Sequence, residues 1–248
     1  MSGRLPASPD ELGEFLTVSA PEEPLRRQAR PRRGEPEPAD HREAKKALLA
    51  WAGDQGLAAY PELRMIVDTH RHRHRLADVG IDVGYGEAWA LEVEYKQAGA
   101  ADWDGKQADY DEARIGCTWI LGHTRVNAAT ERAAAILGGT TLFTQGLVRV
   151  PHIARQISHI DPPARRSVYL INPTLRLIGT LVQPDDPGRL VTLPLERKPG
   201  ERYTYAAVVL DPLEECRFRM PNPEMFYAVE DPSAGFWSPA ATTRSLGR

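Results

Sequence analysis

The sequence has few cysteines, no long apolar run and little net charge, and each of these absences excludes a class of protein. Two cysteines, Cys117 and Cys216, cannot build a disulfide framework or a four-thiolate zinc site. No apolar run approaches the ~18 residues that a transmembrane helix needs. The net charge of −3 over 248 residues excludes a polybasic protein, so any contact with nucleic acid must come from a local patch.

Several functional motifs are missing as well. The chain has no P-loop, no GxGxxG and no Ser–His–Asp constellation, so NTP hydrolysis, dinucleotide binding and serine-based hydrolysis have no support. The N-terminus lacks a charged segment followed by an apolar one, so we expect no secretory signal and a cytoplasmic protein without membrane contact. Apolar residues make up 42% of the chain, which is ordinary globular usage and enough for a sizeable core.

Composition divides the chain into four regions. Residues 1–38 carry seven prolines and few apolar anchors, so we expect a disordered segment. Residues 39–138 alternate helical and strand-like patterns and predict the main folded core. Residues 139–230 consist of short β-rich segments, which predict a β-rich extension or a small second domain. Residues 231–248 have a loop-like composition and predict a flexible tail.

The core region predicts an α/β fold in which antiparallel strands enter a mixed sheet. Asp40 is a candidate N-cap for its first helix. The expected elements are a helix from 41 to about 53–56, strands over 62–69, 74–83 and 88–96, a helix over 102–114, a strand over 117–122 and a helix over 127–137.

Two of the expected strands carry carboxylates that share one face. Asp78 lies on one face of the strand over 74–83, and Glu92, Glu94 and Lys96 share a face of the next strand. Antiparallel pairing brings these faces together, and like charges side by side destabilise a sheet unless something compensates. Mg²⁺ or Mn²⁺ is one compensator. The pattern is that of a nuclease core in which Lys96 assists attack on a phosphate; the alternative is an exposed hairpin with ordinary surface charges.

Five pieces of the sequence, in order and spacing, carry a resemblance to a known family. They are His41 and Lys45 in DHREAKKALLAW, Asp78 in RLADV, Glu92 in LEVEY, the segment WDGKQADY, and the strand GCTWILG. Together they resemble the nuclease domain of the competence protein CoiA-like family, a variant of the PD-(D/E)XK restriction-endonuclease-like superfamily. The resemblance covers residues 40–125. It implies a core of a helix, a three-stranded antiparallel meander, a helix and a strand, and metal-dependent hydrolysis of DNA in uptake, processing or defence.

The resemblance leaves two registers of the acidic residues open. The family usually has Gln two residues after its metal-binding Glu, whereas this chain has Glu94 there, followed by Lys96. Either Glu92 is the ligand together with Asp78, or Glu94–Tyr95–Lys96 is the working acid–x–Lys. We expect Glu92 to be the ligand, with Glu94 at the edge of the metal site. The departure at Glu94 also supports an alternative function, a non-catalytic nucleic-acid-binding protein that retains the nuclease fold.

Five further residues are candidates for contacts with DNA. Arg71, Arg73 and Arg75 lie just before Asp78, where they can clamp a phosphate backbone or form a solvated edge. Gln107 and Tyr110 lie on the helix after the acidic strand, where they approach the scissile phosphate or pack against the sheet.

Three histidines alternate with these arginines. His70, His72 and His74 share one face of an extended segment, a spacing that suits zinc or nickel. Such runs are more often exposed polar strands, so a histidine-based metal sensor is the third hypothesis, behind the nuclease and the non-catalytic binding protein.

Overall fold

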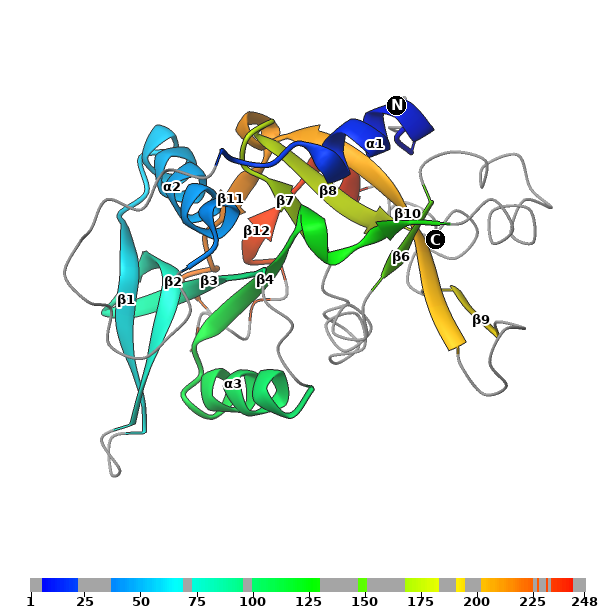
Figure 1. The fold of residues 1–248 in the computed structure, drawn as a ribbon. Coiled ribbons are helices and arrows are strands. Elements are labelled where there is room, and N and C mark those ends of the chain that lie inside the picture. Colours follow the sequence, from blue (N-terminus) through cyan, green and yellow to red (C-terminus); the bar gives the residue numbers. More distant parts are fainter. Residues whose placement is uncertain are drawn as a thin grey trace, which may run out of the picture.

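The computed structural model describes residues 6–21, 37–68, 73–95, 100–129, 147–150, 168–182, 191–194, 202–224, 227, 231 and 233–242. This part of the chain is a mixed α/β fold with one large, mostly antiparallel sheet of ten strands and few helices (Figure 1). The strand order is β1 (Ala59–Asp68), β2 (Arg73–Gly84), β3 (Glu87–Glu94), β4 (Gly116–Gly122), β7 (Tyr169–Asn172), β8 (Leu177–Val182), β10 (Arg202–Pro212), β6 (Leu147–Val150) and β5 (Asn127–Ala128), with β9 (Val191–Pro194) paired to β10.

The remaining elements cover the sheet or extend from it. They are the helices α1 (Pro9–Thr17), α2 (Ala39–Asp54), α3 (Ala100–Glu112) and α6 (Pro239–Thr242), the 3₁₀ turns η1 (His123–Arg125) and η2 (Leu213–Glu215), and a two-stranded ribbon of β11 (Arg217–Arg219) and β12 (Gly235–Trp237). Within the described segments, no helix combines the length and the apolar character needed to cross a membrane.

The core region has the predicted order of elements. After α2, strands β1, β2 and β3 form an antiparallel meander, and β4 then pairs parallel to β3. Parallel neighbours need a crossover connection, and α3 supplies it. The mixed sheet expected from the sequence is therefore confirmed, with strand boundaries that differ by a few residues.

Side-chain alternation on β3 separates two hydrophobic cores. Leu91 and Val93 belong to the core that contains Leu48 and Trp51 of α2. Ala90 belongs to the opposite core, which contains residues of α3. Glu92 lies on the face of β3 that α3 covers, so the predicted charged face of this strand is the one turned to α3.

The β-rich region after residue 140 continues the same sheet. Strand β7 pairs parallel to β4, with Ile120 opposite Tyr169 and Gly122 opposite Ile171. Strands β8, β10 and β6 then follow by antiparallel pairing. The hydrogen-bonded ladder therefore makes this region an extension of the core sheet.

The expectation of disorder over 1–38 is wrong for residues 6–21, which contain α1. Ser8 and Glu11 form a capping box at its start, and this satisfies backbone donors that are otherwise unpaired. Leu12 and Phe15 lie on one face of the helix, and Phe15 is fully buried. The proline-rich composition of the whole segment conceals this short amphipathic pattern. Residues 22–36 lie outside the described part.

Two further expectations need correction. Residues 127–128 form the short strand β5 instead of the start of a helix, because they pair with β6. The remainder of that expected helix, from residue 130, lies outside the described part. The expected flexible tail contains β12 and α6, because Phe236 packs into the core beneath α2 and Ala240 is buried.

Candidate active site

Asp78 lies where strands β2 and β3 separate. The last residue pair of their ladder is Val79 with Leu91, and the preceding residues of β2 pair with β1. Asp78 Oδ2 accepts the backbone N–H of Val93 at 2.9 Å, which ties β2 to β3 at the point where the ladder stops. The carboxylate is therefore held by backbone geometry next to the charged face of β3.

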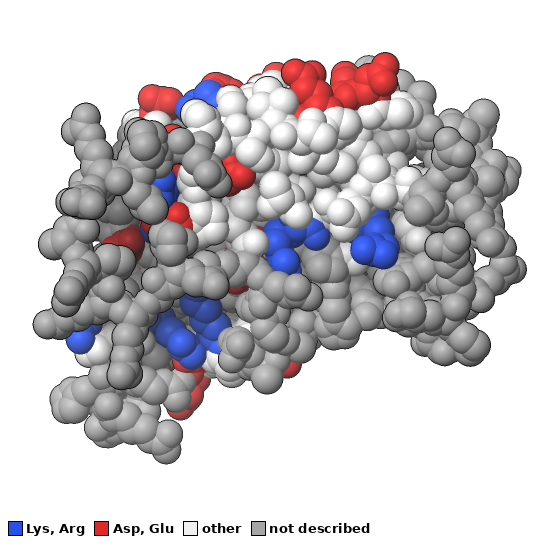
Figure 2. Space-filling model, viewed as in Figure 1, with Lys and Arg blue, Asp and Glu red and all other residues white. Residues whose placement is uncertain are grey.

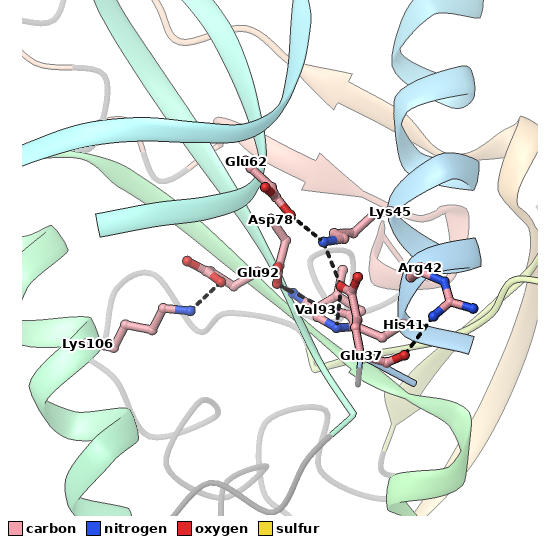
Figure 3. Close-up of polar contacts among 9 residues, drawn as sticks. All are labelled: Glu37, His41, Arg42, Lys45, Glu62, Asp78, Glu92, Val93 and Lys106. Carbon is pink, nitrogen blue, oxygen red and sulfur yellow. Dashed lines mark hydrogen bonds and ion pairs between the residues drawn. The ribbon is translucent and has the colours of Figure 1, made fainter. Parts of the chain in front are cut away.

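Glu92 is buried on this face, beneath α3. Its Oε2 accepts a hydrogen bond from Lys106 Nζ at 2.6 Å, and its Oε1 accepts one from the Tyr110 hydroxyl. Lys106 and Tyr110 are four residues apart on α3, so they lie on the same side of the helix. Figure 3 shows the carboxylates of Asp78 and Glu92 next to each other, with Lys106 on the far side of Glu92.

Helix α2 lines the other side of Asp78 (Figure 3). His41 Nε2 lies 3.3 Å from Asp78 Oδ2, close enough for an ion pair although its geometry is not that of a hydrogen bond. His41 Nδ1 lies 2.9 Å from Glu37, and Lys45 Nζ contacts Glu37 at 2.6 Å and Glu62 at 3.2 Å. The two α2 residues that carry the family resemblance therefore lie beside Asp78.

Burial and charge give the two carboxylates opposite protonation behaviour. Burial raises the pKa of Glu92 to about 7, opposed by Lys106 and reinforced by the charge of Asp78. Burial also acts on Asp78, but His41, the Val93 N–H and Lys106 outweigh it and hold its pKa below the ordinary value. Burial alone would lower the pKa of Lys106, yet the attraction of Glu92 and Asp78 raises it. At neutral pH Asp78 is therefore ionised, whereas the neighbouring Glu92 is divided between its protonated and ionised forms.

Asp78 and Glu92 are the carboxylates that could hold a hard divalent cation here. Among the described residues, no three His, Cys, Asp or Glu side chains are placed to hold a metal ion. Mg²⁺ commonly binds through one or two carboxylates and keeps several waters, so a full set of protein ligands is unnecessary. Asp78 and Glu92 are neighbouring carboxylates, and repulsion by the charge of Asp78 contributes to the raised pKa of Glu92. A cation between them relieves that repulsion.

The structure places the other predicted site residues in different settings. Glu94 is the last residue of β3, half-buried and opposite Leu121 of β4. Lys96 and Arg71 lie outside the described residues, as does the side chain of Arg73, whose backbone starts β2.

Besides Tyr110, two of the predicted contact residues have structural partners. The guanidinium of Arg75 pairs with Asp109 of α3. Gln107 accepts the Trp119 indole N–H at 2.7 Å and donates to Asp111 at 2.7 Å. His70 and His72 lie outside the described residues, and His74 is half-buried on β2 with an unpartnered ring Nδ1.

Lys106 is the site residue that the sequence interpretation missed. It contacts Glu92 directly and lies 5.4 Å from the centroid of the Trp119 ring. A signal was present, because Trp103, Lys106 and Tyr110 recur at helical spacing and so share one face. That face bears a cation and two aromatic side chains, which suits a helix that covers a charged strand.

Comparisons of the chain with protein-family models, with curated proteins and with solved structures found no match. The assignment of a function therefore depends on the chemistry of Asp78, Glu92 and Lys106. These residues bring two carboxylates and one ammonium group together at the point where strands β2 and β3 separate.

Proposed function

We propose that the chain is a metal-dependent nuclease of the PD-(D/E)XK type that hydrolyses DNA phosphodiester bonds. The observation that carries the proposal is the meeting of Asp78, Glu92 and Lys106 where β2 and β3 separate. The order helix, three-stranded meander, helix and parallel strand supports it, since a restriction-endonuclease-like core has the same order. The resemblance of residues 40–125 to the CoiA-like family supports the same function.

Each residue has a role in this proposal. Asp78 and Glu92 hold Mg²⁺ or Mn²⁺, which when bound supplies charge neutralisation and activation of water. Lys106 lies against Glu92, where its ammonium stabilises the negative charge that develops on the phosphate. It therefore provides from α3 the positive charge that the sequence assigns to Lys96. Tyr110 fixes the orientation of Glu92, and His41 fixes that of Asp78.

The test is cleavage of single- and double-stranded DNA with Mg²⁺ or Mn²⁺. We expect Asp78→Ala and Glu92→Gln to abolish cleavage, and Lys106→Met to reduce it by roughly 10²–10³-fold, the usual cost of losing one group that stabilises transition-state charge. Glu94→Gln is the matched control and should retain cleavage, because it changes a neighbouring glutamate outside the pair. An inactive Glu94→Gln beside an active Glu92→Gln would overturn the register. A wild-type protein that does not cleave DNA with either metal would contradict the proposed nuclease function.

One observation favours the second candidate, a non-catalytic nucleic-acid-binding protein with the same fold. Lys106 and Tyr110 already occupy both oxygens of Glu92, as they would in a site that no longer takes a cation. This candidate predicts DNA binding without divalent metal, a steep fall in affinity with salt, and no cleavage. Adding Mg²⁺ or Mn²⁺ to the protein–DNA complex formed in EDTA separates the two functions, because the nuclease then cleaves the DNA and the non-catalytic protein leaves it intact.

A further inference from the structure

A pocket lies just beyond the C-terminal end of α3, next to the candidate active site. It opens between β1, the start of β3 and the C-terminal end of α3, and its volume is about 440 Å³. Leu63 and Met65 give it an apolar lining, while Arg64, Glu87 and Arg114 supply the charged groups. Its volume lies within the range of roughly 300–1,000 Å³ that is typical of small-ligand sites.

Arg114 gives this pocket a planar cationic wall. Its guanidinium carbon lies 4.1 Å from the centroid of the Tyr227 ring, which also lines the pocket. The backbone of Arg114 has φ 56°, in the left-handed region, just after α3, where glycine is the usual residue. An arginine occupies this strained position, and its side chain stacks on Tyr227. A planar ring that enters the pocket can continue the stack.

The pocket and the candidate active site share one face of the sheet. Ala88 lines the pocket, and Glu92 lies four residues further along β3 on the same face, about 13 Å away at the usual rise of a strand. Helix α3 connects the two places, with Lys106 at the site and Arg114 just after its C-terminal end. Figure 2 shows both basic and acidic side chains on the surface of the molecule, viewed as in Figure 1.

We propose that this pocket binds one unpaired nucleotide of the DNA strand being cut, a few nucleotides from the cleaved bond. The proposal rests on the proposed function. Bases stack on arginine planes and aromatic rings, and an acid such as Glu87 accepts a hydrogen bond from an exocyclic amino group. Arg64 lies where it can contact the phosphate. In a duplex, neighbouring bases cover both faces of each base, so the stack selects single-stranded DNA.

The test is fluorescence anisotropy of a labelled single-stranded oligonucleotide and its duplex, titrated in EDTA so that binding is measured without cleavage. We expect the wild type to bind the single strand more tightly. Arg114→Gly should weaken that binding by roughly 5- to 150-fold, the usual effect of losing one stacking contact. Glycine suits the left-handed backbone, so this variant keeps the fold. Tyr227→Ala should act similarly, and Tyr227→Phe should not.

Arg219→Ala is the matched control, since Arg219 also stacks on an aromatic ring, with its guanidinium carbon 4.4 Å from the centroid of the Trp237 ring. Its affinity should equal that of the wild type. Equal binding by Arg114→Gly and the wild type, or equal wild-type affinity for single strand and duplex, would overturn the pocket proposal. If the protein cannot cleave DNA but binds single strands in a way that depends on Arg114, the proposed nuclease function is wrong. The proposal that the pocket binds a nucleotide then still holds.

Discussion

Glu92 is a buried acid that exchanges a proton near neutral pH. Its pKa is raised from the ordinary 4.5 to about 7, because burial disfavours the anion more than Lys106 favours it. Between these two values the folded state binds more protons at Glu92 than the unfolded state does. The free energy of unfolding must therefore fall as pH rises through this window.

This linkage predicts a pH-dependent difference between the metal-free wild type and Glu92→Gln. As pH rises from about 4.5 to about 7, the wild type should lose on the order of 3 kcal/mol relative to the variant, the equivalent of its pKa change. Urea unfolding in EDTA at several pH values measures the difference. Parallel stability curves for the two proteins would contradict the raised pKa.

At the residue scale, the sequence predicts the two carboxylates, Asp78 and Glu92, better than it predicts Lys106, the cationic side chain that pairs with Glu92. Asp78 and Glu92 can be found because alternation on two neighbouring strands is a local rule. Lys106 contacts Glu92 from 14 residues further along the chain, across a helical crossover. The side of α3 that faces the sheet depends on how the helix packs, which spacing alone does not determine. The contact of His41 with Asp78 likewise depends on packing; the family resemblance includes His41 but predicts no contact for it.

At the scale of elements, a partly buried ion pair holds α3 against strand β2. Asp109 of α3 is buried, and Arg75 of β2 is its partner. Removing one member of such a pair leaves a desolvated charge, which typically costs 3–5 kcal/mol. A solvent-exposed pair is worth far less, about 0–1 kcal/mol.

We therefore expect Arg75→Ala to destabilise the protein by about 3 kcal/mol. The matched control is Lys46→Ala, which removes the exposed pair of Lys46 with Glu43 and should cost less than about 0.5 kcal/mol. Urea unfolding measures both variants. The double variant Arg75→Ala/Asp109→Ala should recover part of the loss, and equal effects of the two single variants would show that the partly buried pair is not important.

The elements themselves follow from local patterns where those patterns are long. The meander and α2 have apolar periodicities that a sequence interpretation detects, and their order is confirmed. The sequence does not predict helix α1, because its nine residues lie in a proline-rich stretch. Strand β5 is not predicted either, because two residues are too few to show an alternating pattern and their strand conformation depends on pairing with β6.

At the scale of the whole molecule, α1 closes a core that the C-terminal half builds. Phe15 is fully buried in the same core as Leu170 and Val208. Ala7 N–H donates to Val208 O at 2.7 Å, and the Asn172 amide donates to Phe15 O at 2.6 Å and Val18 O at 2.7 Å. Helix α1 and its flanking residues are thus attached to strands β7 and β10.

Phe15→Ala should therefore lower the stability of the whole protein by about 3–5 kcal/mol, the usual cost of deleting a buried aromatic side chain. Its control is Tyr85→Asn, because Tyr85 is 93% exposed at a positive φ that asparagine adopts readily. The control should change stability by less than about 0.5 kcal/mol. Thermal unfolding followed by circular dichroism decides, and a small effect of Phe15→Ala would mean that α1 contributes little to the core.

The position of α1 also has a consequence for how the chain is made. Its partners on β10 are synthesised about 190 residues after it, which at about 5–20 residues per second takes about 10 to 40 s. Throughout that interval the core that receives Leu12 and Phe15 lacks its β10 residues, so these side chains are more accessible to chaperones and proteases. A ribosome that stalls before residue 208 therefore carries a chain whose first helix lacks its β10 partner.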